Sequence, residues 1–350
     1  MDPHQRGGLK VVAIGGGTGL STILRGLKHF VAPNQASTTH PGPVAFRPDE
    51  PHIENLTAIV TVTDNGGSSG RLRTELNMLP PGDIRNCLVA LSEDEALLSR
   101  LFQYRFTAGE GLEGHNFGNL FLAALTSITG DFAVAVREAA EVLTTRGHII
   151  PSTNSDVQLN ALMDDDSTVR GEVNITASKK RIVELRMVPD NPRPLPQTLD
   201  AIRDADLITI GPGSLFTSLI PNLLVNGIAD AIVNARGVRV FICNLMTQAN
   251  ESLGLTASQH LTTIRSHAGD RRIFDYALLN TAPISPSLRE KYASESAEQI
   301  VNDEDAIEQL GVVPICGPFA AEGSVLRHAE DRVARELLTL GYRGRANELD

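Results

Sequence analysis

The stretch LKVVAIGGGTG, residues 9–19, decides the fold. Its first six residues are almost continuously apolar and match the length of a strand that is buried on both faces of a sheet. The glycine-rich turn GGGTG follows, and apolar residues at helical spacing predict a helix over 20–30. A second apolar stretch, LTAIVTVT at 56–63, predicts the next strand. Strand, helix and strand in this order form a unit with parallel strands and a right-handed crossover.

This unit predicts an α/β protein with a Rossmann-like, mostly parallel sheet and helices on both faces, plus a helical layer and a β-hairpin insertion. The helical layer is expected from helices over 82–91, 95–106, 117–129 and 131–146. The hairpin is expected in the region 148–190, where the segments 169–175 and 181–188 flank a polar turn. We expect a single domain over residues 9–343, with tails at 1–8 and 344–350. Residues 31–52 are rich in Pro, Ser, Thr and Asn and predict a loop insertion.

The composition favours a soluble, cytoplasmic protein. Hydrophobic residues make up 41%, which is enough for a full core. The formal net charge of −11 argues against a nucleic-acid binder, which needs a basic surface. The three Cys lie far apart in apolar stretches, so neither a disulfide framework nor a zinc site is expected. No apolar stretch approaches the roughly 20 residues of a membrane span, and the first ten residues do not resemble a signal peptide.

A second glycine turn follows another predicted strand. DLITI at 206–210 is the strand, GPGS at 211–214 is the turn, and a helix is predicted over 215–225. The carboxyl ends of parallel strands lie at one edge of a sheet, so we expect both turns there, where such folds bind ligands. Glycine lets backbone N–H groups approach an anion, and the helix N-terminus adds positive partial charge. The predicted phosphate-binding residues are Gly15, Gly16, Gly17, Thr18, Gly19, Gly211, Gly213 and Ser214.

Polar loops add side chains to the same edge. Asp64 follows the second strand directly and is the candidate for binding a ligand hydroxyl or a metal ion, or for catalysis. Asp83 either caps the helix that begins near it or serves the site. Arg85 is the candidate for pairing with phosphate. The remaining candidates from these loops are Asn65, Gly66, Gly67, Ser68, Ser69, Asn119 and Asn244.

Two common nucleotide-binding patterns are absent from the sequence. The first turn lacks the spacing G-x-G-x-x-G, and no acidic residue stands about 20 residues further on to bind a ribose. An enzyme that uses NAD(P) is therefore the least favoured interpretation. The turn is not a Walker loop either, because no Gly-Lys-Ser/Thr follows it.

Six segments together resemble a known family. They are GGGTG, TDNGGSSGRLR, PPGDIRN, FGNLFLAALTSITGDF, GPGSLFTSLIPNLLV and CNLMTQ. The chain resembles the gluconeogenesis factor family (YvcK-like proteins) over about residues 11–338. That family is similar to the 2-phospho-L-lactate transferases (CofD-like), which transfer a phospholactyl group to a deazaflavin. The resemblance implies a Rossmann-like core.

The resemblance also implies a function. It is that of a regulatory protein that binds a nucleotide sugar of the UDP-glucose or UDP-N-acetylglucosamine type and acts in carbon metabolism and in cell shape or envelope synthesis. It implies that Gly16, Thr18, Asp64, Ser68 and Ser69 line the nucleotide pocket, and that Tyr292 and Arg327 contact the ligand. Protein partners in these processes are expected, and a homo-oligomer is left open.

The alternative function is a 2-phospho-L-lactate transferase-type enzyme. It would use Asp64 and Mg²⁺ to position a nucleotide diphosphate donor and would transfer a phospholactyl group to a deazaflavin. Two departures from the family pattern weaken this alternative: Asn65 stands where a second Asp is common, and ANES at 249–252 replaces PGET. No other cofactor or metal ion is assigned.

Overall fold

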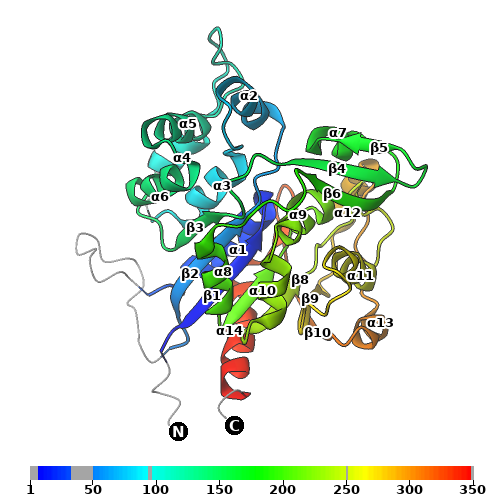
Figure 1. Ribbon diagram of the computed structural model, residues 1–350. Coiled ribbons are helices and arrows are strands. Elements are labelled where there is room, and N and C mark those ends of the chain that lie inside the picture. Colours follow the sequence, from blue (N-terminus) through cyan, green and yellow to red (C-terminus); the bar gives the residue numbers. More distant parts are fainter. Residues whose placement is uncertain (1–6, 33–49, 94–96, 250, 348–350) are drawn as a thin grey trace.

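A seven-stranded parallel sheet forms the centre of the protein. We describe a computed structural model, which places residues 7–32, 50–93, 97–249 and 251–347 (Figure 1). The strand order is β10-β9-β8-β7-β1-β2-β3, and every neighbouring pair is parallel. The strands are β1 (Leu9–Gly15), β2 (Ile53–Val60), β3 (His148–Pro151), β7 (Leu207–Ile210), β8 (Val238–Ile242), β9 (Tyr276–Asn280) and β10 (Val313–Gly317). The predicted α/β class with a parallel sheet is confirmed.

β1 lies where the strand order reverses. The chain proceeds from β1 to β2 and β3 on one side, and later returns to place β7 against the other side of β1. Both β1 and β7 are buried almost completely, as continuous apolar runs in a parallel sheet require. The loops that follow β1 and β7 therefore meet at the switch point of the sheet, where open α/β folds bind ligands.

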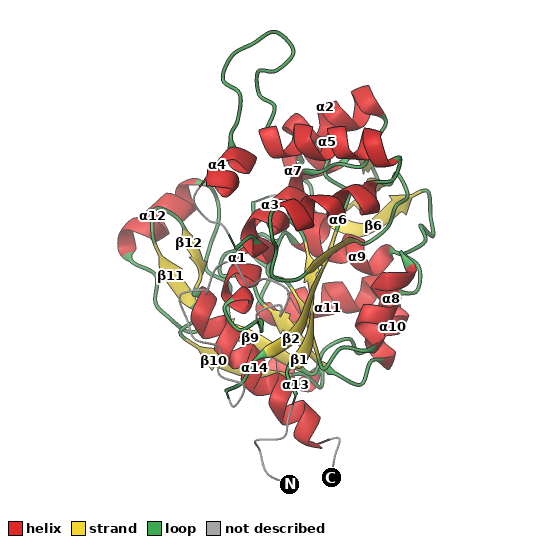
Figure 2. Cartoon of the chain, turned by 90° about the vertical axis from the view of Figure 1, so that its left-hand side faces the viewer, coloured by secondary structure: helices red, strands yellow, loops and turns green. Residues whose placement is uncertain are grey.

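Helices cover both faces of the sheet. Figure 2 shows α1 and α14 on one face and α8 and α10 on the other. Amphipathic patterning accounts for α1, whose apolar side, with Leu20, Ile23, Leu24 and Leu27, is buried. The helices around the sheet are α1 (Gly17–Lys28), α8 (Pro196–Arg203), η2 (Leu215–Leu219), α9 (Ile220–Leu224), α10 (Ile228–Asn234), α11 (Ala257–His267), α12 (Pro286–Ser294), α13 (Glu304–Gln309) and α14 (Glu330–Asn347).

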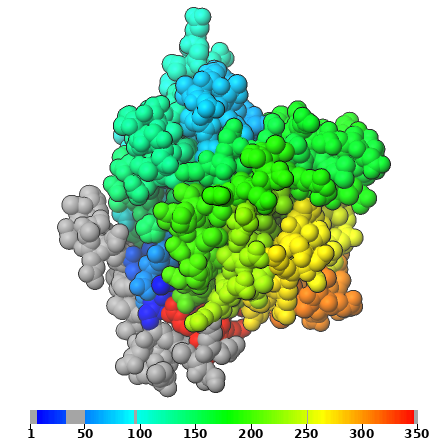
Figure 3. Space-filling model, in the orientation of Figure 1, coloured from blue at the N-terminus to red at the C-terminus, as the bar shows by residue number. Residues whose placement is uncertain are grey.

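The predicted helical layer lies beyond β2. It consists of α2 (Gly67–Leu76), α3 (Gly82–Leu91), α4 (Leu97–Gln103), α5 (Phe117–Thr129) and α6 (Phe132–Val142). Asn116 caps α5 and Asp131 caps α6, each through a side-chain oxygen that accepts a backbone N–H. The loop between α4 and α5 projects at the top of Figures 1 and 3. Arg71 supports this loop by donating to the carbonyl oxygens of Glu113 (2.8 Å) and Gly111 (3.1 Å).

The antiparallel insertion at 148–190 is present, but its strands differ from the prediction. The segments 169–175 and 181–188 do not pair with each other. Three strands form a separate sheet in the order β5-β4-β6: β4 (Gln158–Met163), β5 (Thr168–Arg170) and β6 (Ile182–Val188). Gly171 has a φ of 83° that ends β5, and the chain then forms α7 (Glu172–Ala177) where a strand was predicted. Residues 148–151 form β3 and belong to the main sheet.

The C-terminal boundary also needs correction. Residues 344–347 are not a tail, because α14 continues to Asn347. Arg345 donates to the carboxylate of Asp206 and to the carbonyl oxygens of Gly7 and Gly8, which ties this end to the start of β1. A short hairpin of β11 (Ala320–Glu322) and β12 (Leu326–His328) precedes α14. Most of the insertion predicted at 31–52, residues 33–49, lies outside the described residues, as do 1–6 and 348–350.

The length and composition of the helices in the described part of the chain bear on membrane insertion. No single helix there combines the length and the apolar composition that crossing a membrane requires. The helical segments 215–224 and 228–234 reach this length and apolar composition only when they are taken together, and they are bent by 81° relative to each other.

Candidate functional site

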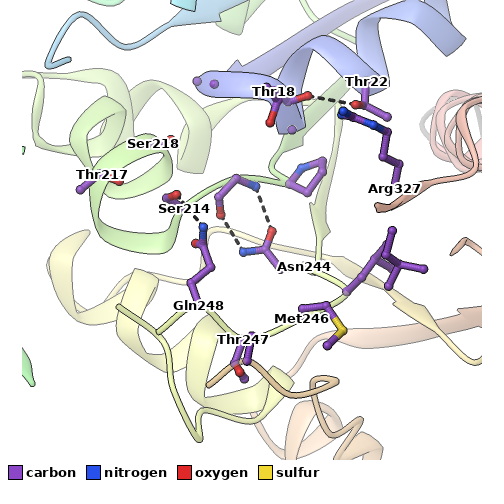
Figure 4. A pocket seen from close by; sticks show the side chains of 18 of the residues that line it. Thr18, Thr22, Ser214, Thr217, Ser218, Asn244, Met246, Thr247, Gln248 and Arg327 are labelled. Carbon is purple, nitrogen blue, oxygen red and sulfur yellow. Dashed lines mark hydrogen bonds between the residues drawn. The ribbon is translucent and has the colours of Figure 1, made fainter. Parts of the chain in front are cut away.

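A cavity of about 790 Å³ opens at the carboxyl edge of the sheet. Both glycine turns line it, together with the loop after β8 and the β12 strand (Figure 4). Its volume falls in the range of roughly 300–1,000 Å³ that is usual for small-molecule sites. The predicted site residues that line it are Gly16, Gly17, Thr18, Gly19, Asp64, Gly213, Ser214, Asn244, Tyr292 and Arg327.

The two glycine turns touch each other. A Cβ on Gly19 would lie 2.8 Å from the carbonyl carbon of Pro212 and closer still to its oxygen. Only glycine fits at this position, because a backbone carbonyl cannot rotate out of the way. The turns after β1 and β7 thus form one continuous wall of the cavity.

The first turn holds a carboxylate of the protein itself. α1 begins at Gly17 without a side-chain cap, and the Gly17 N–H donates to the carboxylate of Asp83. Asp83 does not cap α3, whose N-cap is Pro81 and which has no side-chain cap. Burial, with a further contribution from the nearby Asp64, raises the pKa of Asp83 to about 7.

Side chains also occupy donors of the second turn. The Gly213 N–H donates to Asn244 Oδ1 (2.9 Å), and Asn244 Nδ2 donates to the Gly213 carbonyl oxygen (2.7 Å), as Figure 4 shows. Gln248 Nε2 donates to Ser214 Oγ (3.0 Å). Asn244 therefore fixes the shape of the turn, in addition to facing the cavity.

One end of the cavity is acidic. Asp64, Asp83 and Glu172 all line it. Asp64 Oδ1 accepts the Gly66 N–H (2.8 Å), and Asn65 Oδ1 accepts the Val173 N–H (2.9 Å), which holds α7 against this loop. Burial, followed by the repulsion of Asp64, raises the pKa of Glu172 to about 7. The sequence did not indicate Glu172, because it is more than 100 positions from Asp64 and lay within a predicted strand.

Arg327 from β12 brings a positive charge to the cavity, whose lining also includes Glu295. Arg327 is the single Arg or Lys among the described residues that line it. Its side chain extends toward Thr18 and Thr22 in the first turns of α1 (Figure 4). Tyr292 supports it, because the Tyr292 hydroxyl accepts the Leu326 N–H (3.0 Å). The neighbouring His328 is neutral at physiological pH, since burial lowers its pKa to about 4.

Several predicted site residues lie outside the cavity lining. Ser68 Oγ contacts His115 Nδ1 (3.1 Å) and accepts Asn119 Nδ2 (3.2 Å), within a buried network that joins α2 to α5. Arg85 packs its aliphatic stem on Gly118, and its Nε is buried without a partner. The residues in this group are Gly15, Asn65, Gly66, Gly67, Ser68, Ser69, Arg85, Asn119 and Gly211.

These features define a parallel α/β protein with a polar ligand cavity at the switch point of its sheet. Comparison with known proteins assigns the family. The family model for 2-phospho-L-lactate transferase CofD matches residues 11–320. The gluconeogenesis factor of Halalkalibacterium halodurans is 48% identical over 329 residues, which cover 94% of this chain and 95% of that protein. The gluconeogenesis factor of Bacillus subtilis is 45% identical over 332 residues, covering 95% of this chain and 98% of the relative.

A solved structure agrees with this assignment. The crystal structure of a UPF0052 family protein from Bacillus halodurans superposes with a TM-score of 0.86 at 47% sequence identity, and covers 95% of this chain and 100% of that one. The chain belongs to the CofD family and, within it, to the gluconeogenesis factors.

Proposed function

We propose that the protein binds a nucleotide sugar of the UDP-glucose or UDP-N-acetylglucosamine type in the 790 Å³ cavity. The observation that carries the proposal is Arg327, whose side chain extends toward the N-terminal turns of α1 and which has no acidic partner among the described residues. A guanidinium and a helix N-terminus both favour phosphate oxygens. The diphosphate would lie between Arg327 and the first turns of α1 near Thr18 and Thr22, beside the Gly17 N–H that donates to Asp83.

The acidic end suits the rest of such a ligand. Carboxyl groups accept hydrogen bonds from sugar hydroxyls, whereas they would repel a second phosphate. Asp64 and Glu172 would therefore face the neutral sugar. In a UDP-sugar the diphosphate joins the uridine to the sugar, so a diphosphate beside Arg327 would direct its neutral sugar toward these carboxyl groups.

The biological role that we propose is regulatory. Bound nucleotide sugar would report the state of carbon metabolism, and the protein would act through protein partners on carbon flux and on cell shape or envelope synthesis, in the cytoplasm. The relatives named as gluconeogenesis factors support the link to carbon metabolism.

A second candidate function is metal-dependent transfer of a phospholactyl group. The acidic end favours it, because Mg²⁺ binds one or two carboxylates together with phosphate oxygens. Across the described ranges, no group of three or more His, Cys, Asp and Glu residues is arranged to hold a metal ion. Asp64 would therefore share the ion with the donor diphosphate, and a Fo-type deazaflavin would be the acceptor.

Calorimetry separates these candidates. The protein is titrated with UDP-N-acetylglucosamine, UDP-glucose, GDP, NAD and a Fo-type deazaflavin, with and without Mg²⁺. Saturable binding of a UDP-sugar without turnover supports the regulatory binder. Metal-dependent product formation with the deazaflavin supports the transferase.

A further inference from the structure

A buried carboxyl group, that of Glu251, connects three separate elements. Glu251 is 7% exposed and follows the loop after β8. Its Oε2 accepts the Phe216 N–H (3.2 Å), and its Oε1 accepts the Thr217 hydroxyl (2.8 Å), both in the first turn of η2. The Thr217 N–H and the hydroxyl of Thr176 in α7 also donate to it.

This carboxyl group has donors but no cation. Burial raises the pKa of Glu251, and the groups that oppose this effect are hydroxyls and backbone N–H groups. Burying a carboxyl group is costly unless its oxygens are satisfied, and several convergent donors offset that cost. Such an arrangement holds its donors in fixed positions.

On one side, Glu251 fixes a wall of the cavity. η2 is a π-helical turn in which Ser218 and Leu219 both donate to the Ser214 carbonyl oxygen. π-helical turns are uncommon in proteins, and a large share of those that do occur lie at functional sites. Ser214, Thr217 and Ser218 from this segment line the cavity, and its N-terminal N–H groups are held by Glu251.

On the other side, Glu251 fixes α7. This helix has six residues, of which Ile175 is the one that is buried. Two side chains from outside hold it: Asn65, which accepts the Val173 N–H, and Glu251, which accepts the Thr176 hydroxyl. Glu172 begins this helix and lines the cavity.

We propose that Glu251 is a positioning residue of the ligand site, which locks the first turn of η2 and the α7 helix together so that their side chains face one bound ligand. Glu251 itself is not among the residues that line the cavity. The inference rests on the proposed binding of a nucleotide sugar, and it adds a residue that acts through Phe216, Thr217 and Thr176.

The test compares three variants by calorimetry with UDP-N-acetylglucosamine. Glu251→Ala removes the acceptor and should weaken binding at least tenfold. Glu251→Gln keeps one acceptor oxygen, for either the Phe216 N–H or the Thr217 hydroxyl, and places an NH2 group at the other position, so its affinity should lie between those of Glu251→Ala and wild type. Asp303→Ala is the matched control, because Asp303 also accepts two hydroxyls and a backbone N–H, at the start of α11, is not among the residues that line the cavity, and should leave the affinity unchanged.

Hydrogen exchange provides a readout that needs no ligand. Amides at 214–219 should exchange at least tenfold faster in Glu251→Ala, at an intermediate rate in Glu251→Gln and at the wild-type rate in Asp303→Ala. Unchanged exchange at 214–219, or an affinity loss that Asp303→Ala shares, overturns the positioning role. Failure of the wild-type protein to bind any UDP-sugar would refute the proposed function instead, and the exchange result would still decide whether Glu251 holds η2.

Discussion

Gly19→Ala tests whether the two glycine turns form one wall. Alanine in place of a helical glycine normally gains about 1 kcal/mol of stability. Here the added methyl group would meet the backbone carbonyl of Pro212, with its carbon 2.8 Å away. Forcing apart packed backbone costs up to about 3 kcal/mol, so we expect a net loss of about 2 kcal/mol. For 350 residues this corresponds to a decrease in Tm of about 3 °C.

The matched control is Gly15→Ala, four positions earlier in the same turn. A Cβ on Gly15 would have its nearest contact at 3.5 Å, to Leu20 Cβ, which is ordinary packing. Its free energy of unfolding should stay within about 1 kcal/mol of wild type. Both variants are measured by urea and thermal unfolding. Equal stability of the two variants would refute the contact between the turns.

Three further predictions concern the charges of the cavity. Arg327→Ala should weaken UDP binding at least tenfold with Arg327→Lys in between, as measured by calorimetry, and equal affinities would contradict the phosphate assignment. Because the pKa of Asp83 is raised from 3.8 to about 7, the folded state retains a proton that the unfolded chain releases, so this group makes stability fall as pH rises from about 4 to 7. Asp83→Asn should reduce the decrease in the free energy of unfolding between pH 4 and 7, as measured by urea titrations. An unchanged pH profile of stability would count against the raised pKa of Asp83. Asn65→Asp adds a charge beside Asp64 and Glu172, so it should destabilise the protein at pH 7.5 but much less at pH 5. Equal losses of stability at both pH values in thermal melts would argue against this repulsion.

The sequence predicts the fold well where local patterns decide it. β1 and β7 are short apolar runs followed by glycine turns, and both occur close to where the patterns place them. The strand predicted at 169–175 was wrong for the residues that form α7. The prediction followed from the β-branched residues of this segment, which suit a strand. Gly171 and the tertiary contact with Asn65 override this preference, and neither effect is visible from local composition.

The candidate site divides in the same way. The glycine turns and Asp64 carry a local pattern, and the structure brings them to one cavity. Glu172 and Glu251 carry none, because each acts through contacts with residues far away in the chain. Asp83 illustrates a third case: its position at the start of α3 suggested a cap, yet its carboxylate accepts the N–H of Gly17 in another helix.

Titration of the protein with UDP-N-acetylglucosamine by calorimetry tests the central claim most directly. We predict saturable binding of one ligand per chain, weakened at least tenfold by Arg327→Ala and retained in Gly15→Ala. The absence of heat with any UDP-sugar at high micromolar concentration, from protein shown to be folded, would contradict the account.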